Sequence, residues 1–145
     1  MKLLQSDGDE VIEMLQKTPL WSGLAKQDLR LIVKLSKERK FESGHAIVSK
    51  GEAGVGFYLI LEGSVEVKAN GKTLSKLGPG QFFGEMSILD NKPRSADVVT
   101  VEPSRVLFLS AWSFKAMISD NPKIALKMLQ EFVRRLRDTD KSLSA

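Results

Sequence analysis

The feature that most constrains the fold is a run of short, glycine-separated segments in the middle of the chain. From Phe41 onward, β-forming residues recur with a period of two, and Asn70-Gly71 is a strong signal for a type I′ hairpin turn. Many short strands joined by closely spaced turns are typical of a β-sandwich or a jelly roll. We therefore predict strands at residues 46–50, 56–61, 65–69, 72–77, 97–101 and 105–109.

Helical patterns lie on both sides of these strands. Apolar residues recur with helical spacing over residues 9–18 and 26–37 on the N-terminal side, and over 111–118 and 123–138 on the C-terminal side. A chain of 145 residues has the usual size of one domain. We therefore predict one mainly β domain over residues 1–145, with N-terminal helices at 1–40, the β region at 41–110 and C-terminal helices at 111–145.

Both C-terminal helices are rich in apolar residues, and the last one carries more than a single buried face requires. The apolar pattern of the shorter helix consists of Trp112, Phe114, Met117 and Ile118. In the last helix, one stripe consists of Ala125, Leu129, Phe132 and Leu136, and a second consists of Leu126 and Val133. A helix with two apolar faces must bury both of them. We therefore expect the last helix to pack on its own domain and also on a partner, either a second copy or another protein.

The segment from Phe82 to Asp97 combines groups that suit a small phosphorylated sugar. Gly84 has no Cβ, so a ligand can approach its backbone closely. The residues after it are expected to form about one helical turn, whose first amide groups favour an anion. The guanidinium of Arg94 suits two-point contact with phosphate oxygens, and Ser95 adds a hydroxyl. The carboxylate of Glu85 would repel a phosphate, so we expect it to face sugar hydroxyls.

Two motifs in the β region occur together in one known family. The first is Phe-Gly-Glu at residues 83–85 followed by Pro-Arg-Ser-Ala at 93–96, with a step of ten residues from Gly84 to Arg94. The second lies upstream, at Gly44, Ile47-Val48, Gly51-Glu52, Gly54, Tyr58-Leu59-Ile60 and Gly63. Over about residues 18–137, the chain resembles the cyclic nucleotide-binding domain family, and the first motif resembles its phosphate-binding cassette. The resemblance implies a double-stranded β-helix, the jelly-roll-like β roll of that family, with flanking helices.

The resemblance also implies a function, namely a sensor that binds a 3′,5′-cyclic purine nucleotide, with cAMP ahead of cGMP. It implies that Glu85 accepts a hydrogen bond from the ribose 2′-hydroxyl, while Arg94 and the amides of Met86 and Ser87 face the phosphate. Ser95 would reach the phosphate or the purine. The implied ligand-binding residues are Phe83, Gly84, Glu85, Met86, Ser87, Arg94, Ser95 and Ala96.

By the same resemblance, the last helix closes over the base and relays binding by its movement, with Arg134 or Arg135 in contact with the base. Structural roles remain open beside these. Glu85 also suits the start of a short helix, or pairs with Arg94 in the empty protein. Serines such as Ser95 commonly cap turns, and arginines commonly end a solvated helix. Phe82, Phe83, Phe57 and Tyr58 suit the core.

The composition argues against several other classes of protein. The chain has no cysteine, and its single histidine, His45, has no cluster of potential metal ligands around it. We therefore expect His45 to face solvent and predict no metal site, no cofactor apart from the nucleotide ligand and no enzymatic activity, since no nucleophile–base pair is evident. No apolar run approaches the 18 residues of a membrane span, and the N-terminus turns acidic. We expect a cytoplasmic protein without membrane contact.

Two other functions remain open. A ligand-independent module of this fold would dimerise or dock through the last helix, although the presence of both Glu85 and Arg94 argues against it. A transcription regulator would need a DNA-reading helix, and the sequence has no room for a helix-turn-helix after the last helix. We therefore expect no direct DNA binding, and the chain would be the sensor fragment of such a regulator. The net charge of +4 decides between none of these.

Overall fold

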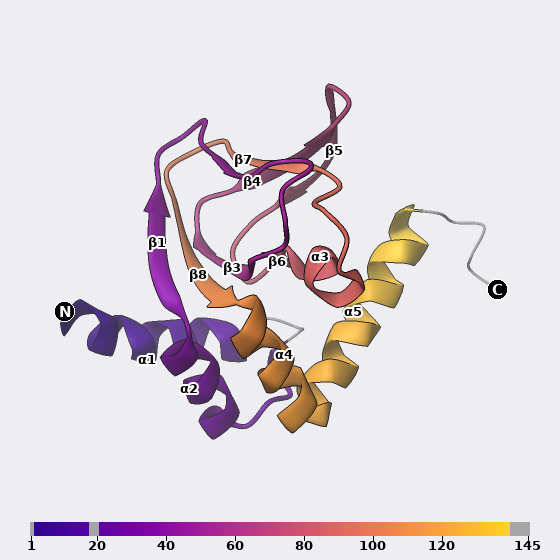
Figure 1. Cartoon of the computed structure of the whole chain (residues 1–145). Coiled ribbons are helices and arrows are strands. Elements are labelled where there is room, and N and C mark those ends of the chain that lie inside the picture. Colours follow the sequence, from indigo (N-terminus) through magenta and orange to yellow (C-terminus); the bar gives the residue numbers. More distant parts are fainter. Residues whose placement is uncertain (1, 18–20, 140–145) are drawn as a thin grey trace.

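Two antiparallel sheets form the centre of the molecule. The computed structural model describes residues 2–17 and 21–139, and in this range the sheets enclose a common interior with helices at one end (Figure 1). One sheet has the strand order β1-β8-β3-β6 and the other β2-β7-β4-β5. The mainly β prediction, a β roll with flanking helices, is confirmed. The strands are β1 (Lys37–Phe41), β2 (Ala46–Val48), β3 (Gly56–Glu62), β4 (Val65–Ala69), β5 (Lys72–Leu77), β6 (Phe82–Phe83), β7 (Asp97–Thr100) and β8 (Ser104–Ser110).

Strand β3 separates two apolar cores. Successive side chains of a strand point to opposite faces, so its residues divide between the two sides. Tyr58 and Ile60 lie in the interior of the roll, whereas Phe57, Leu59 and Leu61 pack on the other side. Both sides are buried, which explains why this strand reads as a continuous apolar run.

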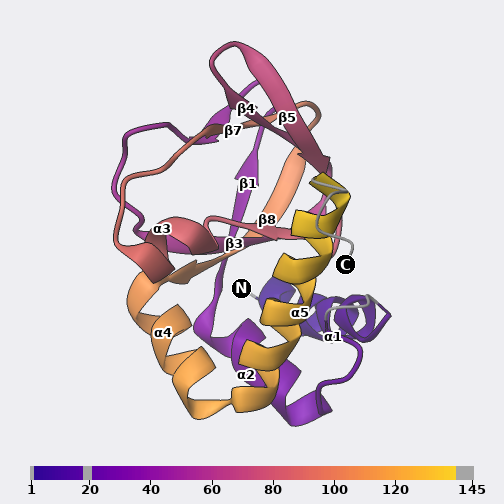
Figure 2. The same ribbon diagram turned by 90° about the vertical axis from the view of Figure 1, so that its right-hand side faces the viewer.

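The second core is covered by the helices α1 (Lys2–Gln16), α2 (Lys26–Leu35), α4 (Ala111–Asp120) and α5 (Pro122–Thr139). The short helix α3 (Glu85–Asp90) lies between β6 and β7 in the chain and adds Ile88 to the same core. Figure 2 shows α5 rising from its start beside α4 to the level of the end of β5. The C-terminal end of α5 therefore lies beside the strands that precede α3 (Figure 2).

Trp21 anchors the N-terminal part of the chain to the roll, because its indole nitrogen donates to the carbonyl oxygen of Gly80 at 3.2 Å.

The boundary between the N-terminal helices and the roll was predicted wrongly. Helix α2 ends at Leu35 rather than at residue 37, because Ser36 has an extended backbone with φ −94° and ψ 161°. Residues 37–41 form β1, which pairs with β8 along its whole length. Tertiary pairing therefore decides the conformation of a charged segment that has little apolar pattern of its own.

Other elements differ in length from the prediction. Helix α1 starts at Lys2, before the predicted residue 9, and the predicted end at residue 18 lies outside the described residues. The strand predicted at 46–50 ends at Val48. The two-residue strand β6 was not predicted, because a pair of phenylalanines is too short to show a period.

Helix α5 has two apolar faces, as predicted, but its residues divide between these faces differently. Helix α5 buries Ile124 and Met128, with Phe132 half-buried against the same core. Its exposed apolar face consists of Leu126, Leu129, Val133 and Leu136. In α4, Phe114 and Met117 are buried, whereas Trp112 is 85% exposed. The predicted packing of the exposed face of α5 on a second copy or another protein stays a prediction.

Candidate functional site

Gly84 forms the turn between β6 and α3, and this turn requires glycine. Its φ of 94° lies in the left-handed region that L side chains rarely adopt. A Cβ at this position would also lie 2.8 Å from the carbonyl oxygen of Gly56 and 3.0 Å from Nη1 of Arg94. The missing side chain therefore allows β3, the turn and the Arg94 guanidinium to meet.

Arg94 is a buried cation held by neutral groups. Only 6% of the residue is exposed. Its Nη1 donates to the carbonyl oxygen of Gly84 at 2.6 Å, and its Nη2 donates to that of Gly56 at 2.8 Å. These bonds fix the guanidinium plane without neutralising its charge. Burial lowers the pKa of Arg94 below its ordinary value, yet an arginine remains protonated in proteins. The site is therefore suited to an anion.

Glu85 is a buried carboxylate with an unused acceptor. The residue is 6% exposed, and its Oε1 has no hydrogen-bond partner among the described residues. Its Oε2 lies 4.0 Å from Nη1 of Arg135 on α5. Burial raises the pKa of the Glu85 carboxyl above its ordinary value, against the opposing effects of its backbone amide, Arg135 and Arg94. A buried acceptor without a donor is costly, so the site is suited to a hydroxyl-bearing ligand.

The interpretation that Glu85 pairs with Arg94 in the empty protein was wrong. Arg94 donates to two main-chain carbonyl oxygens, and the ion pair of Glu85 is with Arg135. The left-handed turn at Gly84 is the reason, because it brings a carbonyl oxygen to within hydrogen-bond distance of the guanidinium.

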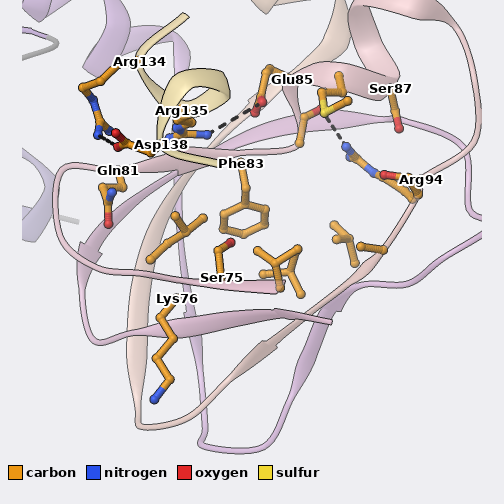
Figure 3. A pocket seen from close by; sticks show the side chains of 18 residues that line it. Ser75, Lys76, Gln81, Phe83, Glu85, Ser87, Arg94, Arg134, Arg135 and Asp138 are labelled. Carbon is orange, nitrogen blue, oxygen red and sulfur yellow. Dashed lines mark hydrogen bonds and ion pairs between the residues drawn. The ribbon is translucent and has the colours of Figure 1, made fainter. Parts of the chain in front are cut away.

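One cavity of about 390 Å³ brings the candidate residues together (Figure 3). It lies between the segment 82–97, the strands β4 and β5, and the C-terminal end of α5. All ten residues singled out from the sequence line it: Phe83, Gly84, Glu85, Met86, Ser87, Arg94, Ser95, Ala96, Arg134 and Arg135. Their contacts with a ligand stay a prediction.

The lining residues differ in exposure. Ser87 is buried, and a Cβ at Gly54 would lie 2.5 Å from the Cβ of Ser87, so the loop before β3 packs directly on α3. Met86 and Ser95 are exposed. Phe83 forms part of the cavity wall, with its ring stacked on Tyr58 at 4.9 Å between centroids. The apolar roles expected of Phe83 and Tyr58 fit their burial.

Sequence reasoning missed the far wall of the cavity. These residues come from β2, β4, β5, β7 and the adjoining turn, and from the end of α5. The alternation of each strand could have identified the inward positions, but no motif marks them. They are Val48, Val67, Ser75, Lys76, Leu77, Gln81, Val98 and Asp138.

Arg135 connects α5 to the segment before α3. Its guanidinium carbon lies 4.4 Å from the centre of the Phe82 ring, and Nη2 donates to the carbonyl oxygen of Phe82 at 3.3 Å. Within α5, its Nε donates to Glu131 at 3.1 Å. Arg134 instead pairs with Glu131 and Asp138 of its own helix. Of the two arginines, Arg135 is therefore the one that couples the helix to the site.

Neither a cluster of metal ligands nor a membrane-spanning helix is found in the part of the chain that the structure describes. No group of three or more histidine, cysteine or acidic residues there could hold a metal ion. None of the described helices combines the length and the apolar character needed to cross a membrane. His45 is exposed, with its ring 4.9 Å from that of Phe41.

Comparison with known proteins identifies the fold and the family. The profile of the cyclic nucleotide-binding domain matches residues 38–121. The cyclic AMP receptor protein of Thermus thermophilus is 35% identical over 131 residues, which are 87% of this chain and 61% of that protein. A regulatory subunit from Trypanosoma brucei, described as belonging to a cAMP-independent protein kinase A, has a TM-score of 0.77 at 25% identity and covers 97% of this chain and 49% of its own.

The crystal structure of the Thermus thermophilus catabolite activator protein has a TM-score of 0.77 and 36% identity, and the match covers 88% of this chain and 62% of that one. The chain thus spans about 61% of the length of its Thermus relative. The matched region contains the roll, the left-handed turn at Gly84 and the buried Glu85 and Arg94. The chain belongs to the cyclic nucleotide-binding domain family.

Proposed function

We propose that the cavity binds a 3′,5′-cyclic purine nucleotide and that the domain is a cytoplasmic, non-catalytic sensor. The observation that carries this proposal is that one cavity is lined by two buried groups of opposite charge, and each of them has a binding position that a ligand would fill. Arg94 is a cation without a bonded anion, and Oε1 of Glu85 is an acceptor without a donor among the described residues. A cyclic nucleotide has one anionic phosphate and a nearby 2′-hydroxyl, so it would satisfy both.

The phosphate would lie at the start of α3. There the amides of Met86 and Ser87 belong to the first helical turn, where N–H groups lack intrahelical partners. Arg94 would add a charge-assisted contact from the other side. The 2′-hydroxyl would donate to Oε1 of Glu85.

The base would lie toward β4, β5 and the end of α5. Val67 and Leu77 offer apolar surface to a flat ring, and Arg135 lies at the helical side of the cavity. We propose cAMP rather than cGMP as the preferred ligand, because the Thermus relative is named as a cyclic AMP receptor.

Glu85 would also transmit binding to α5. A ligand hydroxyl on Oε1 leaves Oε2 facing Arg135, so the ligand and α5 hold the same carboxylate. Ligand binding would then favour the position of α5 in which Arg135 contacts Glu85, which is a population shift between two packings. The exposed face of α5 would carry this change to a second copy or to another protein.

A ligand-independent interaction module is the second candidate. The Trypanosoma brucei regulatory subunit is described as belonging to a cAMP-independent protein kinase A, and the four exposed apolar residues of α5 suit docking. A Mycobacterium tuberculosis relative is named as a cAMP-activated global transcriptional regulator, so the chain also fits a role as the sensor part of such a protein, in which a separate domain would contact the DNA.

Calorimetric titration with cAMP, cGMP and 5′-AMP tests the proposal. Any copurified ligand is first removed by unfolding and refolding. Saturable binding of cAMP, with weaker binding of cGMP and much weaker binding of 5′-AMP, is the expected result. Absence of binding by all three would leave the interaction module as the function.

A further inference from the structure

The two N-terminal helices pack against each other and expose opposite charges. Helix α1 exposes Asp9, Glu10 and Glu13, and helix α2 exposes Lys26, Arg30 and Lys34. The cations of α2 recur every fourth residue, so they form one row with a spacing of about 6 Å along the helix. Asp9 and Glu13 have the same spacing on α1. We call these six residues the N-terminal charged face.

The charges of this face are segregated rather than mixed. Residues 1–16 contain four acidic residues and one lysine, whereas residues 17–40 contain seven lysines or arginines and two acidic residues. Some other cations of the domain are paired, such as Arg105 with Glu38 and Glu62. Within the described residues, none of the six side chains of the N-terminal charged face makes an ion pair or a side-chain hydrogen bond.

The packing of the two helices explains why the charges face solvent. Val11, Ile12 and Leu15 of α1 and Leu29, Ile32 and Val33 of α2 belong to one core, which fixes the orientation of both helices. Beside the basic row, Leu31 is 38% exposed and Leu35 is 41% exposed. The exposed side of α2 therefore combines cations with apolar surface.

We propose that the N-terminal charged face associates with the same face of a second copy of this chain. In a two-fold arrangement, α1 of each copy lies on α2 of the other, so both charge-complementary contacts form at once. The chain itself supplies an acidic helix with the matching four-residue spacing. A nucleic acid or an anionic membrane would match the basic row, but the acidic residues of the adjacent α1 would repel it. A second copy carries both signs of charge and fits both helices.

This association differs physically from any contact through the exposed face of α5. Ion pairs at a surface are individually weak, and salt screens them. Contact between apolar faces is not weakened in this way. We therefore expect weak self-association that is strengthened at low salt and lost at high salt, independently of nucleotide binding.

Sedimentation velocity of the whole chain at low and high sodium chloride is the first test. Because the Debye length falls from roughly 30 Å at about 0.01 M salt to about 3 Å at about 1 M, we expect the dimer dissociation constant to rise at least about tenfold across this range. Leu129→Asp on α5 is the matched control, and it should keep the salt-dependent association. A wild-type protein that stays monomeric at low salt would overturn the proposal, even if it binds duplex DNA or anionic vesicles.

Charge reversal gives the sharper test. One variant carries Asp9→Lys, Glu10→Lys and Glu13→Lys, and the other carries Lys26→Glu, Arg30→Glu and Lys34→Glu. Each variant alone should be monomeric, because its two contacts join like charges. A mixture of the two should form a heterodimer, because both contacts then join opposite charges.

The result that contradicts the proposal is a mixture that stays monomeric while each variant melts at the wild-type temperature. If a triple variant does not fold, the single changes Glu13→Lys and Arg30→Glu replace it. These should show the same pattern with a smaller shift in the dissociation constant. Self-association that persists in both reversed variants but is lost in Leu129→Asp would move the interface to α5.

Discussion

The two sides of the cavity are built in opposite ways. On the side of residues 82–97, Arg94 is 6% exposed and is held by two main-chain carbonyl oxygens. On the side of α5, Arg135 is half-buried and is held by Glu131, by the ring and carbonyl oxygen of Phe82, and by Glu85 at 4.0 Å. The carbonyl oxygens that hold Arg94 change position only when the backbone does. The contacts of Arg135 can instead break and re-form one at a time.

This difference assigns different tasks to the two sides. A guanidinium that is fixed before a ligand arrives has little orientation to lose, which favours recognition. A helix end held by several modest contacts can change its position when one of them changes, which favours a response. Glu85 lies between the two sides, with one oxygen unused among the described residues and the other facing α5.

Removal of the fixed cation is expected to have the largest effect. Arg94→Ala should weaken cAMP binding roughly 10- to 150-fold, since a hydrogen bond to a charged group contributes about 1.5–3 kcal/mol. The matched control is Lys92→Ala, which removes an exposed cation two residues earlier and should change affinity less than about twofold. Calorimetry measures both. Equal losses in the two variants would remove Arg94 from the phosphate site.

Arg94→Ala should also lower the stability of the domain, because Arg94 holds two main-chain segments together. The substitution leaves the carbonyl oxygens of Gly84 and Gly56 without their donor. Each buried unsatisfied acceptor costs about 1–3 kcal/mol, so the unfolding midpoint in urea should fall as well. Arg94→Lys, which keeps the charge but not the fork, should recover part of the affinity.

Gly84→Ala tests whether the fixed side of the cavity depends on the left-handed turn and its close packing. Gly84→Ala should destabilise the domain by about 1–3 kcal/mol from its left-handed backbone alone, and by more from the close approach to Gly56. Gly71→Ala is the control, because Gly71 has a φ of 76° but an added Cβ there would meet no atom within 4 Å. Urea unfolding of both variants measures the difference. If Gly84→Ala is no less stable than Gly71→Ala, the close packing at the turn is not required.

Removal of Arg135 tests the adjustable side and should have a smaller effect. Arg135→Ala should weaken cAMP binding by about three- to tenfold, because it removes the partly exposed cation that faces Glu85. Hydrogen exchange of residues 131–139 in the nucleotide complex should become faster. Arg134→Ala is the control, since Arg134 pairs only within α5 in the described residues. Equally slow hydrogen exchange in both variants would show that Arg135 does not couple α5 to nucleotide binding.

The pH dependence of stability is expected to be the smallest effect. Burial raises the pKa of Glu85 in the folded protein above its ordinary value of 4.5, so the folded state takes up a proton at a higher pH than the unfolded state does. Between these two pKa values, the contribution of Glu85 to stability rises as the pH falls. Glu85→Gln should lack this gain in urea unfolding at a series of pH values. An identical pH profile in the two proteins would contradict the raised pKa.

Much of the fold follows from local pattern, and the failures have a common cause. Alternation and the Asn70-Gly71 turn predicted most strands, because these signals act within a few residues. Strand β1 was missed because its pairing with β8 joins residues far apart in the sequence. The burial of Ile124 and Met128 rather than Leu129 likewise depends on which face of α5 meets the core.

In the candidate site too, residues marked by a local motif could be predicted, and residues placed by tertiary structure could not. Gly84, Glu85 and Arg94 lie in one short segment of the chain, so the sequence could predict that these residues share a cavity. The far wall, which includes Val67 and Ser75, comes from strands that carry no motif. The partner of Glu85 could not be predicted, because it depends on how the end of α5 approaches α3.

The most direct test of the account concerns the unused oxygen of Glu85. Calorimetry of the wild type and Glu85→Ala with cAMP and 2′-deoxy-cAMP forms a double-mutant cycle. If the ribose 2′-hydroxyl donates to Oε1, removing it should weaken binding about tenfold or more in the wild type and less than about twofold in the variant. An equal loss in both proteins would show that Glu85 does not hold the ribose, and would contradict the proposed contact between the 2′-hydroxyl and Oε1.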